Sequence, residues 1–141
     1  MKQIIPIEIL AINHLGYHIM VKGEANAYKI HLLIDTGATI TVMDLQRIKT
    51  VYPHLEIKPY NNFFMGIGTS EIDTYSTILD QFNIGDCKIL NQEVILIDMV
   101  SINKAYAAFD LPRIDGVIGG DILYRYRAVI NYNKAFLEME E

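Results

Sequence analysis

Isoleucine is the residue that most restricts how this chain can fold: 23 of its 141 residues are isoleucine, spread along the sequence in short apolar runs. A β-branched side chain is stiff about χ1 and suits the pleated surface of a sheet better than a helix. Glycine, asparagine, aspartate and proline separate the runs, as expected for turns between strands. The sequence therefore predicts an all-β fold with two or three short helices.

The expected elements follow one another without a repeat or a linker, so we expect one domain over residues 1–141. Strands are expected over 4–12, 17–21, 28–34 and 93–97, the last of them buried on both faces. Hairpins are expected over 56–79, around the turn at 85–86, and over 128–139. Helices are expected over 44–52, over 101–109 with Ser101 as its N-cap, and over 121–124.

Charge and hydropathy exclude several classes of partner. The chain has 12 basic and 17 acidic residues, a net charge of −5, so nothing in it attracts a phosphate backbone and no nucleic-acid partner is expected. No apolar run reaches the roughly 18 residues of a membrane-spanning helix, so no membrane partner is expected. Pro6 and Glu8 interrupt the stretch that a signal peptide would need to be apolar, which favours the cytoplasm.

No residue pattern predicts a metal or another cofactor, and we expect none. His14 and His18 are four residues apart with Gly16 between them, a spacing that does not bring two ligands together on a strand and turn, and we expect both to be solvated. Cys87 is the only cysteine and cannot form an internal disulfide. Its one basic neighbour is Lys88, so nothing marks it as a nucleophile.

The tripeptide Asp35-Thr36-Gly37 is the first candidate for chemistry. It follows the apolar run Leu32-Leu33-Ile34 and precedes the small residues Ala38-Thr39, so an aspartate stands where a buried strand turns. One reading of this motif is structural, with the Asp35 side chain bonded to the backbone two residues on, as in many turns. The other reading is a catalytic carboxylate, and it depends on what else the chain carries.

A second motif, Asp115-Gly116-Val117-Ile118-Gly119-Gly120-Asp121, is an apolar segment closed by glycines. Between the two motifs lies an expected hairpin with the tip Gly66-Ile67-Gly68-Thr69-Ser70. In this order the three features resemble the retropepsin-like aspartic proteases, from about Ile7 to Met139. The resemblance implies a closed barrel equivalent to one lobe of an aspartic protease, in which Asp35 is catalytic and Val117-Ile118-Gly119 supports its loop.

Peptide hydrolysis by carboxylates needs one ionised group to take a proton from water and one protonated group to give a proton to the scissile carbonyl oxygen. Two aspartates about 3 Å apart supply both states, because they cannot both ionise. The chain has only one Asp-Thr-Gly, so the pair has to come from two chains of a two-fold homodimer. A mean hydropathy of +0.19 is high for a small domain and fits an apolar surface covered in such a dimer.

The neighbours of Asp35 have separate expected roles. The Thr36 hydroxyl can donate and accept hydrogen bonds that tie the loop to its counterpart, and Gly37 lets a substrate backbone approach. We expect substrate contacts from the loop, the hairpin tip and the later motif, at Ala38, Thr39, Met65, Gly66, Ile67, Gly68, Val117 and Ile118. The tip would act as a flap that pairs with an extended peptide. The alternative is a solvent-facing hairpin with a flexible tip.

Two positions differ from the retroviral members of the family. Those usually carry an arginine after the Gly of the later motif and an acidic residue after Asp-Thr-Gly-Ala, which together brace the dimer; this chain has Gly120 and Thr39 there. The chain is also longer, with 101–109 as the addition, which is closer to the cellular, bacterial branch. The expected function is an aspartic endopeptidase that acts as a homodimer on peptide or protein substrates. The alternative is a non-catalytic, dimeric peptide-binding module with the same fold.

Overall fold

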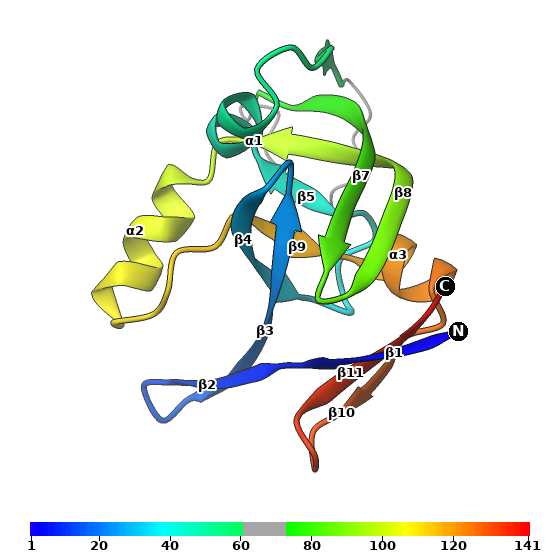
Figure 1. Cartoon of the computed structure of the whole chain (residues 1–141). Helices are drawn as coiled ribbons and strands as arrows, with labels where there is room; N and C mark the ends of the chain where they lie inside the picture. The colour runs from blue at the N-terminus through cyan, green and yellow to red at the C-terminus, as the bar shows by residue number, and fades with distance from the viewer. Residues whose placement is uncertain (61–72) are drawn as a thin grey trace.

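The computed structural model of the chain describes residues 1–60 and 73–141, and within these ranges the fold is mainly β with three short helices, as predicted (Figure 1). The strands are β1 (Lys2–Pro6), β2 (Glu8–Ile12), β3 (Gly16–Ala25), β4 (Tyr28–Ile34), β5 (Val42–Asp44), β6 (Lys58–Pro59), β7 (Tyr75–Ile84), β8 (Cys87–Ile97), β9 (Gly116–Ile118), β10 (Val129–Asn131) and β11 (Phe136–Glu140). The helices are α1 (Leu45–Val51), α2 (Val100–Ala108) and α3 (Gly120–Arg125).

Six strands form a closed barrel in the order β3, β4, β9, β5, β8 and β7, and β7 pairs again with β3. The sheet is mixed, because β4–β9 and β5–β8 are parallel and the other barrel pairs are antiparallel. Closure depends on Gly23, where a Cβ atom would lie 2.4 Å from the carbonyl oxygen of Asn83. The absence of a side chain there lets the two backbones approach closely enough to pair.

The expected strand over 4–12 is wrong, because the chain changes sheet in its middle. β1 pairs with β11 in a three-stranded sheet of order β1, β11, β10, which brings the two termini together (Figure 1), whereas β2 pairs with β3. The break falls at Pro6 and Ile7. Pro6 has no N–H to continue the ladder, and the Ile7 N–H instead donates to the carbonyl oxygen of Ala135 at 3.1 Å.

The wall of the barrel carries apolar side chains on both of its faces. In β8 the four consecutive residues Val94, Ile95, Leu96 and Ile97 are all buried, which confirms the predicted doubly buried strand. Val94 and Leu96 belong to the main core inside the barrel, whereas Ile95 and Ile97 belong to a second, smaller core. The second core also contains Met20, Met99 and Ile114.

The predicted helix over 44–52 is confirmed as α1, and the Asp44 carboxylate caps it by accepting the Arg47 N–H at 3.2 Å. The predicted helix over 101–109 exists as α2, but its cap is wrong. Ser101 is an exposed residue inside the first turn, and the Asp98 carboxylate accepts the Val100 N–H at 2.9 Å instead. No residue of α2 is buried.

The expected hairpin over 56–79 is present at its base, where Lys58 lies opposite Ser76 and Pro59 opposite Tyr75. Its tip lies outside the described residues, and with it the predicted contacts Met65, Gly66, Ile67 and Gly68. The hairpin with its turn at 85–86 is confirmed as β7–β8, and the closing hairpin as β10–β11. Within the described ranges, no helix is both long enough and apolar enough to cross a membrane.

Cys87 begins β8 and is fully buried. Burial, followed by the negative charge of Glu141, raises the pKa of its thiol to about 11. At pH 8 only about one thiol in a thousand would then be ionised, and the thiolate is the reactive form. We expect a disulfide-exchange reagent to leave the native protein unlabelled over minutes at pH 8 and to label one thiol per chain in denaturant. Rapid labelling of the native protein would contradict this placement.

Candidate active site

Asp35 follows the last residue of β4 and begins an exposed loop. The backbone fixes its position: its N–H donates to the Ile118 carbonyl oxygen at 3.0 Å, and its carbonyl accepts the Ala38 N–H at 3.1 Å. The Gly37 N–H donates to Asp35 Oδ1 at 2.9 Å. This is the side-chain bond to the backbone two residues on that the structural reading of the motif predicts. Within the described ranges no group donates to Oδ2. The carboxylate is therefore held in place and open to solvent.

The later motif runs directly beneath the Asp35 loop. Ile118 lies opposite Ile34 in β9, and the first N–H groups of α3 then donate to the loop, Gly120 to the Ala38 carbonyl at 2.7 Å and Asp121 to the Thr39 carbonyl at 3.2 Å. At Gly119 a Cβ atom would lie only 2.7 to 2.8 Å from backbone atoms of the loop. Its φ of −100° is open to any residue, so the glycine is required for space alone.

Thr41 is a residue of this site that the sequence reasoning missed. It is fully buried, and its hydroxyl donates to Asp121 Oδ1 at 2.7 Å. The Thr41 hydroxyl oxygen also accepts the Gly119 N–H at 3.0 Å. Its carbonyl accepts the Ile95 N–H at 3.0 Å. The one available signal was a hydroxyl between Ile40 and Val42, since a polar side chain in an apolar run needs a buried partner.

Asp121 links this bond to a wider polar network. Its Oδ2 atom accepts from Gln92 Nε2 at 3.3 Å, and Arg125 Nη1 donates to Gln92 Oε1 at 3.2 Å. Asp121 lies in the first turn of α3, as predicted. Gly120 and Thr39, the two positions at which the sequence differs from the retroviral pattern, each make a backbone hydrogen bond within the chain, Gly120 through its N–H and Thr39 through its carbonyl.

A second polar cluster supports the start of β9 and of α1. Buried Asp44 accepts the Met99 N–H at 3.0 Å and lies 3.3 Å from Arg113 Nη2. Asp115 Oδ2 accepts the His31 N–H at 2.8 Å. Its Oδ1 has no well-aligned hydrogen bond but lies 3.4 Å from Arg47 Nε, so it is ion-paired. Each buried carboxylate thus faces an arginine, which offsets the cost of burying its charge.

The predicted site residues have different degrees of access. Thr36, Gly37 and Thr39 are exposed beside Asp35, and Ala38 is half-buried. Val117 is half-buried too, on the face of β9 away from the main core. Ile118 is fully buried in the main core, beneath the loop, and its contact with substrate stays a prediction.

The prediction that His14 and His18 are both solvated is half right. His14 is exposed, but His18 is half-buried and its Nδ1 atom lies 2.8 Å from the Tyr106 hydroxyl. Over residues 1–60 and 73–141, no three histidine, cysteine, aspartate or glutamate side chains gather at a spacing that could hold a metal ion.

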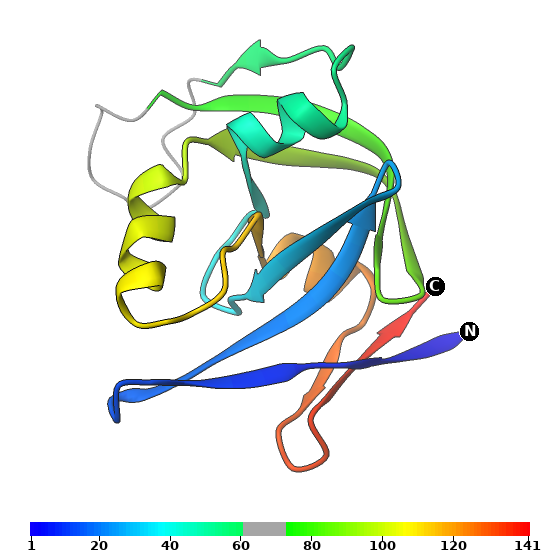
Figure 2. The same ribbon diagram turned by 60° about the vertical axis from the view of Figure 1, so that its left-hand side comes forward.

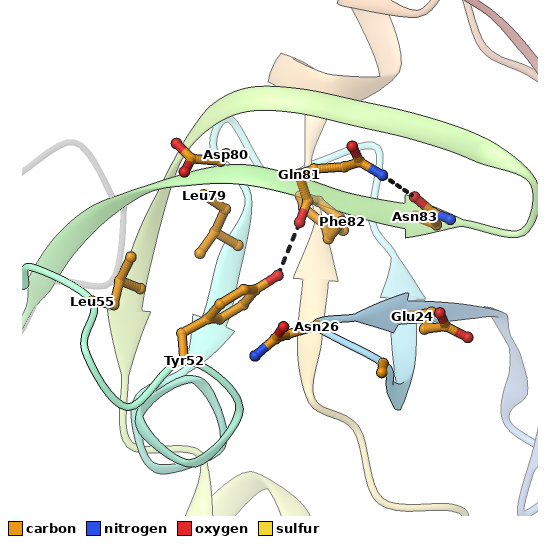
Figure 3. A pocket seen from close by; sticks show the side chains of 10 residues that line it. Glu24, Asn26, Tyr52, Leu55, Leu79, Asp80, Gln81, Phe82 and Asn83 are labelled. Carbon is orange, nitrogen blue, oxygen red and sulfur yellow. Dashed lines mark hydrogen bonds between the residues drawn. The ribbon is translucent and has the colours of Figure 1, made fainter.

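A hollow elsewhere on the barrel is bordered by α1, β7 and the turn between β3 and β4 (Figure 3). The Tyr52 hydroxyl donates to the Gln81 carbonyl at 2.9 Å, and Asn26 Nδ2 donates to the Val51 carbonyl at 2.7 Å. Burial, and then the charge of Asp80, raise the pKa of Tyr52. Both donors thus have a backbone acceptor, and Asp35 does not line the hollow.

The close approach at Gly119 gives a paired prediction. Gly119→Ala should lower the free energy of unfolding by about 1–3 kcal/mol, because the new methyl group meets backbone atoms that cannot move aside without shifting the loop. Gly120→Ala is the matched control, since its Cβ atom would meet nothing nearer than 3.5 Å. Denaturant unfolding measures both. Equal stability of the two variants would contradict the threading of this loop.

The geometry agrees with comparisons to known proteins. A sequence model described as aspartyl protease matches residues 20–122. No curated protein is detectably similar in sequence. Among solved structures, a retropepsin-like aspartic protease from Rickettsia conorii is similar with a TM-score of 0.56 and 15% identity, covering 99% of this chain and 90% of that chain.

Two further structures have the same fold. The retroviral protease-like domain of Ddi1 from Leishmania major has a TM-score of 0.57 and 14% identity, covering 86% of this chain and 87% of that one. The EIAV protease in complex with the inhibitor HBY-793 has a TM-score of 0.56 and 18% identity, covering 86% of this chain and 99% of that one. The barrel is therefore retropepsin-like. Because the aspartyl protease model matches most of the chain, over residues 20–122, this chain belongs to the aspartyl protease family.

Proposed function

We propose that the protein is an aspartic endopeptidase that hydrolyses peptide bonds as a homodimer, with Asp35 of each chain in one shared active site. The observation that carries the proposal is Asp35, exposed at the end of β4. Its carboxylate accepts the Gly37 N–H, and its own backbone N–H donates to the Ile118 carbonyl. Membership of the aspartyl protease family supports the same reading.

The homodimer follows from the number of catalytic motifs. One chain supplies a single Asp-Thr-Gly. A two-fold axis through the loop would place each Asp35 opposite its own copy, an isologous contact. Thr36, exposed next to it, would reach the same axis and could bond to the partner loop without adding charge.

In this arrangement, the ionised carboxylate of the pair takes a proton from water as the water oxygen attacks the scissile carbonyl carbon. The protonated carboxylate gives its proton to the carbonyl oxygen, so a neutral tetrahedral intermediate forms. The carboxyl group that took the water proton then gives it to the leaving nitrogen, while the other carboxylate takes a proton from a hydroxyl of the intermediate. The C–N bond breaks, the carbonyl re-forms as the new carboxylic acid, and the pair again holds one shared proton. Holding both groups in place before the substrate arrives lowers the entropy cost of the reaction.

The substrate is proposed to be a peptide or protein segment in extended form, in contact with Ala38, Thr39 and Val117. The flap, with Met65, Gly66, Ile67 and Gly68, remains a proposal from the order of the motifs along the sequence, in which its backbone adds a strand to the peptide.

The test compares the wild-type protein with Asp35→Asn on a randomised peptide library, with cleavage products read by mass spectrometry. We expect wild type to cleave and Asp35→Asn to lose at least about a hundredfold in rate, as when a general acid or base is removed. Asp86→Asn, the same change at an exposed aspartate in the β7–β8 turn, should keep full activity. Sedimentation of each variant at the assay concentration should give a dimer.

The outcomes separate the two candidate functions. A dimer that binds library peptides while neither wild type nor Asp35→Asn cleaves them would favour the non-catalytic peptide-binding module. A protein that stays monomeric at every concentration and cleaves nothing would contradict both the shared site and the proposed activity.

A further inference from the structure

The barrel wall beside Asp35 has an apolar outer face. Leu32 and Ile34 belong to the main core, whereas Leu33 between them packs with the second core. Because side chains alternate along a strand, Leu33 and Asp35, two residues apart, share the outer face. A peptide bound at Asp35 would therefore lie over this outer face, where the second core is packed.

A row of apolar side chains crosses this face from strand to strand. Leu33 of β4 lies opposite Val117 of β9, Val117 opposite Val42 of β5, and Val42 opposite Ile95 of β8. Ile95 is fully buried, and the other three are half-buried. We call these four residues the apolar row. Its partly open surface lies next to the candidate carboxylate.

His18 reaches the same face from the neighbouring strand. The antiparallel register of β3 and β4 ends at the pair Ile19 and Ile34, and the next position places His18 alongside Asp35. His18 Nδ1 lies 2.8 Å from the hydroxyl of Tyr106, which is 88 residues away in the sequence. The two ring centroids are 5.8 Å apart.

Tyr106 is the side chain through which α2 contacts this face. It packs against the second core, together with Leu33 and Val117 of the apolar row. The helix, seen at the side of the barrel in Figure 2, buries none of its own residues. Its other firm attachment is a pair of hydrogen bonds between the Asn103 side chain and the backbone of Ile114, at 2.8 and 3.1 Å. The helix is therefore attached to the barrel at two points, Tyr106 and Asn103.

The Tyr106 side chain is close enough to Asp35 for its charge to act on the phenol. The pKa of Tyr106 is raised, mainly by burial and secondly by the negative charge of Asp35. A tyrosine already carries its proton at neutral pH, and the raised pKa extends this to higher pH. Whichever tautomer His18 adopts, one of the two groups donates to the other, and the bond fixes the direction of the ring.

We propose that Tyr106 is a specificity-determining residue of the candidate site: its ring, held by His18, closes the side of the apolar row next to Asp35 and limits the size of the peptide side chain accepted beside the scissile bond. This inference rests on the proposed function. It assigns a substrate-contacting role to α2. From the sequence, this segment was expected only as an addition relative to the retroviral proteases.

The test measures cleavage of a peptide series that varies only in the residue next to the scissile bond, from valine and leucine to phenylalanine and tryptophan. Tyr106→Ala should raise kcat/KM for the aromatic peptides relative to the valine peptide by about tenfold or more, mainly through KM, because removing the ring opens room for a second one. Tyr106→Phe keeps the ring but loses the His18 bond, and should shift the preference in the same direction by less.

Two controls separate specificity from general damage. Lys104→Ala changes an exposed residue of the same helix and Tyr132→Phe changes an exposed tyrosine of the β10–β11 turn, and both should leave the preference unchanged. A uniform fall in activity on all peptides, with a lower Tm and no change in preference, would mean that Tyr106 only supports the fold, and this would overturn the inference.

The test distinguishes this inference from the proposed function. If wild type cleaves and Tyr106→Ala has the wild-type preference, the inference fails and the activity stands. If wild type cleaves nothing, the proposed activity fails, and binding of the same peptide series to wild type and Tyr106→Ala decides the inference. A shift of binding toward aromatic peptides in the variant supports it, and identical binding overturns it.

Discussion

The close contact at Gly119 between the loop that carries Asp35 and the turn from β9 into α3 is the constraint on which the rest of the structure depends. Backbone atoms of Ile40 and Ala38 occupy the space where a side chain would stand. Because the two segments touch through their backbones, the N–H groups of α3 can bond to the loop from below. A loop that would otherwise be mobile thus becomes a fixed base for one exposed carboxylate.

The wall beside Asp35 has two faces, and the two cores pack on opposite sides of it. The inner face of β4 and β9 contributes Leu32, Ile34 and Ile118 to the main core, and this fixes the strands. The outer face presents Leu33 and Val117, half-covered, next to the carboxylate. Stability comes from one face and the candidate binding surface from the other, so a change on the outer face can alter recognition without emptying the core. Because of this separation, we assign the proposed role in substrate specificity to Tyr106, through which α2 is attached.

Local patterns predicted the parts of the fold that local forces determine. The run before Asp35 became β4 with its expected bounds, and the helical spacing over 44–52 became α1, because strand and helix patterns act within a few residues. The order of the motifs predicted the barrel and the approach of the later motif to Asp35. The change of sheet at Ile7 was missed, because it depends on which distant strand each half pairs with.

The remaining errors concern polar side chains whose partners lie far away in the sequence. Thr41 bonds to Asp121, 80 residues on, and His18 to Tyr106, 88 residues on. A hydroxyl in an apolar run indicates that a partner exists but does not say which one. The predicted cap of α2 was wrong for a related reason. Serine is a common N-cap residue, but the chain leaves β8 so that Asp98 accepts the Val100 N–H at the start of the helix.

The central claim is that each chain carries half of an active site, completed by a second copy. A crystal structure of the assembled protein tests it most directly, through the separation of the two Asp35 carboxylates. The account predicts a two-fold axis at the loop, with oxygen atoms of the two carboxylates about 3 Å apart. A dimer that leaves each Asp35 facing solvent, with no second carboxylate near it, would contradict the claim.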